Sequence, residues 1–345
     1  MDSVDILFHF HGTTDSSLIG TRVKALGDIN NDGFDDIAFN SRSPIGAYIF
    51  YGSNSPDSTP DLFIRGGVSG DKMLDFTGDN IADLVTVWAS QEKVFLYRGY
   101  NDSLEGVASD SIAPDSGTFL FGSSAASGLV SDDNIADLLV RDINNPGGGK
   151  LYYYENPFTT DKASDWTFEI SDLSHSIFSI AMVDFNGDSY QDAIIALKAD
   201  MDTISYVYIF LGPQFSDSPN VVLTAPPGFE SLDQERFGDA VFNIGDVNGD
   251  NWEDLAIIFH SRVLIYLCGP GADSLYDFYL LGGAKSMSSA GDVNGDGAND
   301  IIAGDGRTLH GAVDIYLGGR NFDIYSDKSI VRSDLPPLVL KSHWL

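Results

Sequence analysis

The sequence predicts an all-β fold, a β-propeller of four-stranded blades, and three observations support this prediction. An acidic loop recurs six times along the 345 residues, and apolar segments of strand length follow each copy. Turn-forming Gly, Asp, Asn, Ser and Pro interrupt the chain about every 8 to 12 residues, the spacing of short strands. No window holds the apolar period of a helix. Four-stranded units in series are typical of a propeller.

The acidic loop is clearest in DVNGDGAND (292–300), where Asp or Asn occupies alternate positions before a glycine and a closing Asp. The six copies begin at 28, 75, 129, 184, 246 and 292, so their spacing ranges from 46 (292 − 246) to 62 residues (246 − 184). Periods of this length indicate a repeat architecture. We expect one propeller domain over residues 1–345, with repeat cores starting near 21, 71, 124, 178, 237 and 286.

Apolar segments supply the strands of each repeat. The segment after the loop, such as DLAIIF (254–259), is almost continuously apolar, which suits an inner strand between two neighbouring blades. RVLIYLCGP (262–270) then alternates aliphatic and aromatic residues before a glycine, and YDFYLLGG (276–283) follows it. With the short segment ahead of each loop, these make four strands per unit.

The termini leave the number of blades open at six or seven. VDILFHFHG (4–12) and PPLVLKS (336–342) both resemble outer strands, which gives seven outer-strand candidates for six loops. We hypothesise that the chain is a fragment cut where a seventh repeat would start. An ordered six-fold ring with one terminus detached would count against this hypothesis.

The composition of the loop predicts a cation site. Carboxylates this close repel one another and are costly to bury, so the loop is either wholly solvated or holds a cation. Side chains at positions 1, 3, 5 and 9 and the backbone carbonyl at position 7 offer only oxygen ligands, which calcium prefers. We predict about five Ca²⁺ sites, with the following ligands: Asp28, Asn30, Asp32, Phe34 and Asp36; Asp75, Thr77, Asp79, Ile81 and Asp83; Asp184, Asn186, Asp188, Tyr190 and Asp192; Asp246, Asn248, Asp250, Trp252 and Asp254; Asp292, Asn294, Asp296, Ala298 and Asp300.

Position 6 of the loop must turn the chain back, and a left-handed backbone there suits Gly and Asn best. These residue types occupy it in four of the five complete loops, and Ser189 is the weakest member. In the third copy, LVSDDNIAD (129–137), Leu129 and Ser131 replace the first two ligands, so we predict that this loop binds no ion.

Two other interpretations of the loops are less favourable. An EF-hand needs a glutamate at position 12 and flanking helices, whereas position 12 here falls on Phe39, Ile257 and Ala303 inside predicted strands. Solvated Asx-turns without metal remain the alternative, and five copies in register argue against them. Five divalent ions would change the formal charge from −32 to −22 (5 × 2 = 10) and so relieve repulsion.

Composition excludes several kinds of partner. Fifty-one acidic and 19 basic residues argue against nucleic acid and anionic membrane surfaces. No stretch approaches the roughly 18 apolar residues of a membrane span, so we expect no membrane insertion. The first residues lack the features of a signal peptide, so a signal for export would lie outside this chain. The single Cys268 excludes an internal disulfide framework.

No catalytic residue stands out in the sequence. The motifs of serine hydrolases, zinc proteases and phosphate-binding loops are missing. His9 and His11 alternate on one predicted strand, and a half-exposed strand explains them more simply than a metal pair. The ion already accounts for the paired carboxylates, which are therefore poor indicators of acid and base roles. We expect no enzyme activity.

The units resemble FG-GAP repeats, which build the propeller of integrin alpha subunits and of many bacterial surface proteins. RFGDAVFNIGDVNGDNWEDLAIIF (236–259) carries the resemblance most fully, with Phe237-Gly238 as its FG. The GAP element is reduced to AGDG (303–306) in the sixth unit and is absent from most others, as in divergent members. The resemblance implies seven blades, structural calcium loops on one face, partners on the opposite face and an extracellular or cell-surface location.

These features lead to one main hypothesis, a calcium-stabilised, non-catalytic interaction module outside or on a cell that binds a protein or a glycan. A lectin-like propeller is one alternative. The rings of Trp252 and Tyr190 are its candidates for stacking on sugars, although packing on neighbouring backbone explains them more simply. A catalytic or non-catalytic part of a polysaccharide-degrading enzyme is the other alternative.

Overall fold

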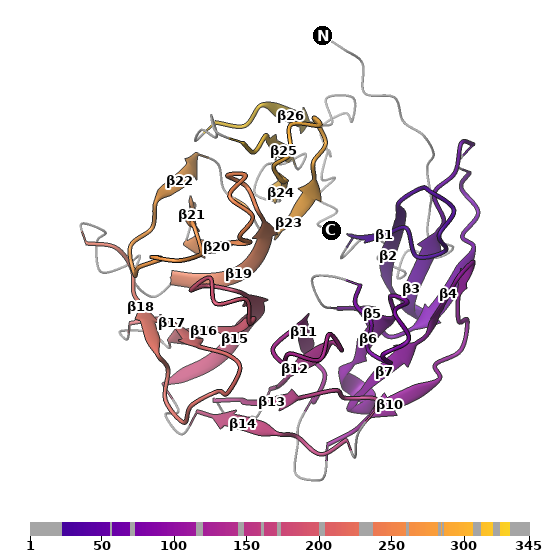
Figure 1. Cartoon of the computed structure of the whole chain (residues 1–345), viewed down its shortest axis with the longest axis horizontal. Helices are drawn as coiled ribbons and strands as arrows, with labels where there is room; N and C mark the ends of the chain where they lie inside the picture. Colours follow the sequence, from indigo (N-terminus) through magenta and orange to yellow (C-terminus); the bar gives the residue numbers. More distant parts are fainter. Residues whose placement is uncertain are drawn as a thin grey trace, which may run out of the picture.

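Six four-stranded antiparallel sheets follow one another in chain order around a ring (Figure 1). The computed structural model describes residues 23–55, 57–69, 73–114, 120–143, 148–159, 162–170, 174–199, 204–227, 237–259, 262–281, 284, 286–305, 312–319 and 325–331. The prediction of an all-β propeller with four-stranded blades is confirmed. The segments 4–12 and 336–342, from which the hypothesis of a seventh repeat started, lie outside the described residues.

Each sheet takes its strands from one stretch of the chain, with the first strand nearest the centre of the ring (Figure 1). The first three sheets consist of β1 (Val23–Gly27), β2 (Asp36–Arg42), β3 (Ile45–Phe50) and β4 (Leu62–Arg65); β5 (Gly67–Val68), β6 (Leu84–Trp88), β7 (Lys93–Tyr97) and β10 (Asp110–Ile112); and β11 (Ser124–Gly128), β12 (Asp137–Asp142), β13 (Lys150–Tyr154) and β14 (Trp166–Glu169).

The other three sheets consist of β15 (His175–Val183), β16 (Asp192–Ala199), β17 (Tyr206–Phe210) and β18 (Val221–Leu223); β19 (Phe237–Gly245), β20 (Asp254–Phe259), β21 (Arg262–Tyr266) and β22 (Phe278–Leu281); and β23 (Ser286–Gly291), β24 (Asp300–Asp305), β25 (Ala312–Tyr316) and β26 (Lys328–Val331). The second sheet also carries a hairpin of β8 (Gly99–Tyr100) and β9 (Ser103–Leu104), and a short 3₁₀ turn, Ala89–Gln91, joins β6 to β7.

The core consists of apolar layers between neighbouring sheets. In β20, Leu255 and Ile257 pack toward the fourth sheet, whereas Ala256 and Ile258 pack toward the sixth. Successive strand residues point to opposite faces, so a strand covered on both sides needs an unbroken apolar run. The prediction that this segment is an inner strand between two blades is therefore confirmed.

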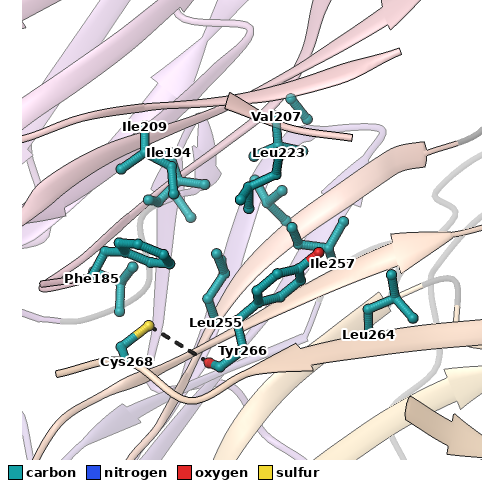
Figure 2. Close-up of a cluster of buried hydrophobic side chains, with 14 of the residues drawn as sticks. Phe185, Ile194, Val207, Ile209, Leu223, Leu255, Ile257, Leu264, Tyr266 and Cys268 are labelled. Atoms are coloured by element: carbon teal, nitrogen blue, oxygen red, sulfur yellow. Dashed lines mark hydrogen bonds between the residues drawn. The ribbon is translucent and has the colours of Figure 1, made fainter. Parts of the chain in front are cut away.

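Figure 2 shows the layer between the fourth and fifth sheets, where Ile194 and Val207 meet Leu255 and Tyr266. Cys268 closes this layer, and its thiol lies 3.6 Å from the Tyr266 carbonyl oxygen. Burial raises the pKa of the Cys268 thiol, so the group stays neutral and acts as a small apolar side chain.

The Phe237-Gly238 pair holds the fifth sheet against the fourth. Phe237 is fully buried and its ring lies 5.8 Å from that of Phe259 in an edge-on contact. Gly238 has φ 76°, and a Cβ there would lie 3.1 Å from the Val207 side chain and 3.2 Å from Ala196. The glycine therefore permits both the backbone turn and the close approach of the two sheets.

Candidate metal centres

Each acidic loop joins the first strand of a sheet to the second. In the fifth sheet, Asp246 follows β19 directly and Asp254 is the first residue of β20. Just ahead of this loop, β19 bulges between Asn243 and Gly245, and Gly245 has φ 74°. The first and sixth sheets have the same bulge, with Gly27 and Gly291 at φ 67°. A glycine bulge bends the end of the strand and so aims the loop.

Backbone N–H groups shape the fifth loop around its first aspartate. Asp246 Oδ1 accepts hydrogen bonds from the N–H of Gly249 (2.7 Å) and Asp250 (3.1 Å), and Oδ2 accepts one from Asn251 (2.7 Å). In all five complete loops the first aspartate accepts the N–H groups of positions 5 and 6. The loop thus curls around this carboxylate.

Position 6 has a positive φ in every loop, as the sequence predicted. The angles are 92° at Gly33, 65° at Asn80, 76° at Ser189, 75° at Asn251 and 94° at Gly297. Ser189 adopts the same conformation as Gly and Asn despite its side chain. In that conformation its N–H reaches Asp184 Oδ2 at 2.8 Å, so the hydrogen bond offsets the backbone strain.

The closing aspartate of each loop is fully buried. Asp254 Oδ2 accepts the N–H of Val247 (2.9 Å) and Oδ1 accepts that of Cys268 (3.0 Å). Burial raises the pKa of Asp192 and of Asp254 to about 7 and that of Asp83 to about 6, and the other aspartates of each loop add to the rise. Each loop therefore concentrates negative charge around a carboxylate that has lost its water.

The donor set fits a hard cation. Carboxylates at positions 1, 5 and 9, amide or hydroxyl oxygens at position 3 and a backbone carbonyl at position 7 are the ligands that calcium takes. Among the described residues, no three His, Cys, Asp or Glu side chains lie in a ready-made metal arrangement. The carboxylates instead face backbone N–H groups. Asp246 Oδ1 already accepts two of them, whereas Oδ2 accepts one and keeps a second lone pair for a cation.

Backbone hydrogen bonds link three pairs of neighbouring loops. Position 8 of one loop donates its N–H to the carbonyl of position 1 in the preceding loop, as Asn299 does to Asp246 (2.6 Å) and Ala136 to Asp75 (2.7 Å). Gln191 makes the same bond to Leu129 (3.0 Å). The loops therefore lie side by side at one end of the propeller, and an ion in one loop would brace its neighbour.

The rings at position 7 pack on neighbouring backbone. The Trp252 ring lies over Gly269, where an added Cβ would meet it at 2.7 Å. The Cβ of Tyr190 lies beside Gly212, where an added Cβ would meet it at 3.1 Å. The Tyr190 hydroxyl donates a hydrogen bond to Asp132 in the third loop (2.9 Å). These contacts give both rings a structural task, which is the simpler of the two explanations drawn from the sequence.

The third loop has a different internal network. Its first position is Leu129, and an amide from the end of β13 reaches into the loop: Asn156 Nδ2 donates to Asp133 Oδ2 at 2.6 Å. The Ser131 hydroxyl donates to Asp133 Oδ1 at 2.9 Å. Partial desolvation raises the pKa of Asp133, but the bonds from Asn156, Ile135 and Ser131 outweigh it and hold this pKa below its usual value.

Sequence reasoning missed Asn156. The residue that donates its backbone N–H to the closing aspartate is a glycine in four sheets, at Gly52, Gly99, Gly212 and Gly318. In the third sheet this residue is Asn156, whose N–H reaches Asp137 at 3.1 Å. The signal was therefore present, because YYYEN (152–156) replaces a strand that ends in glycine in the one repeat that lacks two ligands.

The chain shows sequence similarity to integrin alpha chains. It is 29% identical to integrin alpha-5 of Xenopus laevis over 213 residues, or 53% of this chain and 20% of that protein. It is 28% identical to integrin alpha-IIb of Mus musculus over 152 residues, or 36% of this chain and 14% of that protein. Integrin alpha-PS5 of Drosophila melanogaster is 23% identical over 183 residues, or 46% of this chain and 17% of that protein. The matches thus span a fifth or less of these relatives.

Other comparisons add little. No protein-family model matches the chain. The solved structure titled "Structure of Dos1 propeller" covers 87% of this chain and 67% of its own, at 10% identity and a TM-score of 0.49. The strand pairing of the six sheets, rather than this likeness, defines the architecture.

Six four-stranded blades in a ring define the class, a β-propeller. The sequence similarities of the chain are to integrin alpha chains, at 29% identity or less and over about half of this chain or less. The resemblance to bacterial surface proteins stays an expectation. Within the residues that the structure describes, no helix is both long and apolar enough to cross a bilayer.

Proposed function

We propose that the chain is a calcium-stabilised, non-catalytic interaction module that binds a protein or a glycan outside the cell or on its surface. The observation that carries this proposal is the buried closing aspartate, repeated in five loops that each supply further oxygen ligands. A buried carboxylate beside two or three others is costly unless a cation compensates it. Calcium would be held by the five ligand sets predicted from the sequence.

An extracellular setting suits such sites. Calcium loops of extracellular modules bind with Kd values of roughly 10⁻⁴ to 10⁻³ M, which the calcium concentration outside cells is sufficient to fill. The similarity to integrin alpha chains supports the same setting.

The partner would bind at the end of the ring opposite the calcium loops. The loop between the first and second strands keeps a fixed length of eight residues in five sheets, for example 246–253 and 292–299. The connections between the second and third strands, at the other end, vary from two residues (43–44) to seven (143–149). Recognition commonly uses the variable loops of a rigid scaffold, so variation at one end supports a binding role there.

A binding role accounts for the carboxylates without catalysis. In the five complete loops, each closing aspartate is engaged by two backbone N–H groups from its own sheet, as Asp192 is by Phe185 (2.9 Å) and Gly212 (2.8 Å). A general acid or base needs a group that faces a substrate, whereas these carboxylates face the loop interior.

The test is a screen of the full chain against a glycan array and a panel of extracellular proteins, in calcium and in EDTA. We expect saturable binding of a partner. Substitutions in the 143–149 connection should weaken this binding, and EDTA should abolish it because the loops lose their calcium. Turnover of a polysaccharide by the purified chain would contradict the proposal. So would a partner whose binding tolerates EDTA and every substitution at the end opposite the calcium loops.

A further inference from the structure

A small pocket opens between the outer strands of the second and third sheets. Its volume is about 120 Å³. At about 10 to 15 Å³ for each water position, this volume holds about eight to twelve water-sized positions, so it can enclose most of a monosaccharide-sized ligand and leave the remainder exposed. Sheet three contributes alternate residues of β13, which share one face, and sheet two contributes the residue that follows β10. The lining residues are Ala113, Lys150, Tyr152, Tyr154, Lys162, Ser164 and Thr167.

The residues that line this pocket are basic, unlike the chain as a whole. Two lysines and no carboxylate line it, although the chain has 51 acidic and 19 basic residues. The Lys150 ammonium lies 5.0 Å from the centre of the Tyr152 ring. Glu169 lies opposite Lys150 in the strand register, yet within the described part of the chain Lys150 forms no ion pair.

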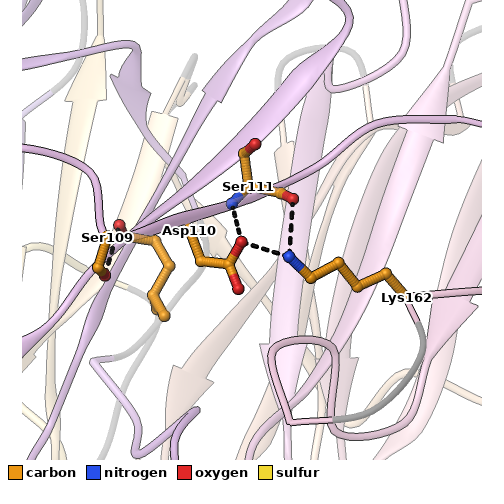
Figure 3. Close-up of polar contacts among 5 residues, drawn as sticks. Ser109, Asp110, Ser111 and Lys162 are labelled. Carbon is orange, nitrogen blue, oxygen red and sulfur yellow. Dashed lines mark hydrogen bonds and ion pairs between the residues drawn. The ribbon is translucent and has the colours of Figure 1, made fainter.

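Lys162 is held in place at the edge of the pocket. Figure 3 shows its ammonium paired with the Asp110 carboxylate and directed at the Ser111 carbonyl oxygen (3.4 Å). Its backbone has φ 67°, a conformation that is uncommon for a side chain of this size. The carboxylates of Asp110 and Glu169 lie beside the two ammonium groups, so the four charges balance. Of the two lysines, Lys162 is paired, and Lys150 offers its ammonium group to an incoming carboxylate.

Hydroxyl groups complete the lining. Tyr152, Tyr154, Ser164 and Thr167 each carry a hydroxyl that can both donate and accept hydrogen bonds. The half-buried Tyr152 ring also offers an apolar edge, since it packs against Phe121 at 5.4 Å. An acidic peptide side chain would use the ammonium groups alone, whereas a sugar acid would use the ammonium groups and the hydroxyls together.

We propose that this pocket binds one carboxylate-bearing sugar residue of the uronic acid type. The carboxylate would pair with Lys150 and Lys162, and the sugar hydroxyls would exchange hydrogen bonds with the hydroxyls of Ser164 and Thr167. The pocket lies at the outer edge of the ring and contains none of the predicted calcium ligands. Lys150 directly follows the 143–149 connection, so the pocket adjoins the proposed partner-binding end. The two proposals are tested with different probes, so either can fail without the other.

The test is a binding measurement on the full chain in calcium, by ligand-observed NMR and calorimetry, with D-galacturonate as the probe. D-galactose is the matched neutral sugar, and acetate is the matched carboxylate. We expect saturable galacturonate binding that is at least about tenfold tighter than that of either control, because each control satisfies only half of the pocket. We also expect binding to weaken as salt is added.

Two substitutions assign the binding to the pocket. Lys150→Met and Lys162→Met should each weaken galacturonate binding at least about tenfold. The matched control is Lys198→Met in the fourth sheet, since Lys198 also pairs with an aspartate, Asp239 (2.9 Å), and lies 4.4 Å from the Phe178 ring. This control should bind like the wild type. If Lys162→Met lowers the unfolding temperature, the result for Lys150→Met decides whether the pocket binds galacturonate, because that substitution breaks no ion pair.

Several results would overturn the proposal. One is the absence of saturable galacturonate binding to the wild-type chain. A second is equally tight binding of galactose, which would show that the carboxylate is not recognised, or of acetate, which would show that the sugar is not recognised. A third is unchanged binding after Lys150→Met.

Discussion

The third and fifth loops have the same backbone frame and different interiors. In both, the closing aspartate accepts the N–H of position 2: Val130 to Asp137 at 2.8 Å, and Val247 to Asp254 at 2.9 Å. The fifth loop curls around the carboxylate of Asp246, whereas the third has Leu129 there and receives the amide of Asn156. The frame therefore depends on the closing aspartate, and the interior can be stabilised by a cation or by a neutral amide.

This difference separates two sources of stability in one ring. Five loops concentrate carboxylates that repel one another, so their stability should depend on calcium. The third loop satisfies its carboxylates with protein donors, so its stability should not. Because Gln191 bonds to Leu129 and Ala136 to Asp75, the third loop can link its neighbours even without an ion.

Removal of calcium should have the largest effect. With about 2 mM calcium and Kd values of roughly 10⁻⁴ to 10⁻³ M, five sites together add about 3 to 9 kcal/mol to the free energy of unfolding. Differential scanning calorimetry in calcium and in EDTA measures this loss, and magnesium at the same concentration is the control. An unfolding temperature that is the same in calcium and in EDTA would contradict the proposed role of the five loops.

Asn156→Gly should destabilise the third loop by about 1 to 3 kcal/mol, because it removes a hydrogen bond to a charged group. Glycine tolerates the backbone conformation of Asn156, which has φ 50°, and four other sheets have glycine at this position. Urea unfolding in calcium and in EDTA should give the same loss in both. A loss seen only in calcium would mean that the third loop also depends on an ion.

Asp246→Asn should cost about 1 to 2 kcal/mol in calcium and less in EDTA, because it removes a charged ligand from one of five sites. The asparagine keeps an oxygen for the N–H groups of the loop, so the fold should survive. Calorimetry should also show one calcium fewer per chain. Equal destabilisation with and without calcium would assign Asp246 to the loop backbone alone.

A change of pH should have a smaller effect, opposite in sign with and without calcium. Burial raises the folded-state pKa of Asp192 and Asp254 to about 7, above the value in the unfolded chain. Between about pH 4 and 7 the folded state then binds more protons, so in EDTA these groups make the chain less stable as pH rises. In calcium, protons compete with the ion, so the chain should be less stable at pH 6 than at pH 8.

Scanning calorimetry at pH 6 and pH 8, in calcium and in EDTA, compares the two trends. A change of unfolding temperature with pH that has the same sign in calcium and in EDTA would contradict calcium binding by these carboxylates.

The repeat and the loop chemistry could be predicted from the sequence because both lie in short, regularly spaced stretches. DLAIIF (254–259) predicted an inner strand since its apolar run has a single explanation in a sheet covered on both sides. The left-handed turn at position 6 followed from Gly and Asn in the same way, and Ser189 conforms to it.

Long-range contacts could not be predicted in this way. Asn156 acts on Asp133 from 23 residues away, and the bonds between loops join residues of different repeats. The pocket between the second and third sheets joins Ala113 to Lys150. Spacing within a repeat carries no information on such pairs, because they depend on how one sheet packs against the next.

A count of bound calcium tests the central claim most directly. After removal of metal, isothermal titration calorimetry and elemental analysis of the dialysed chain should both give five calcium ions per chain. Asn156→Gly combined with Leu129→Asp and Ser131→Asn should raise the number to six, since it gives the third loop the ligands of the others. A wild-type chain that holds no calcium at extracellular concentrations, or that holds six, would contradict the account.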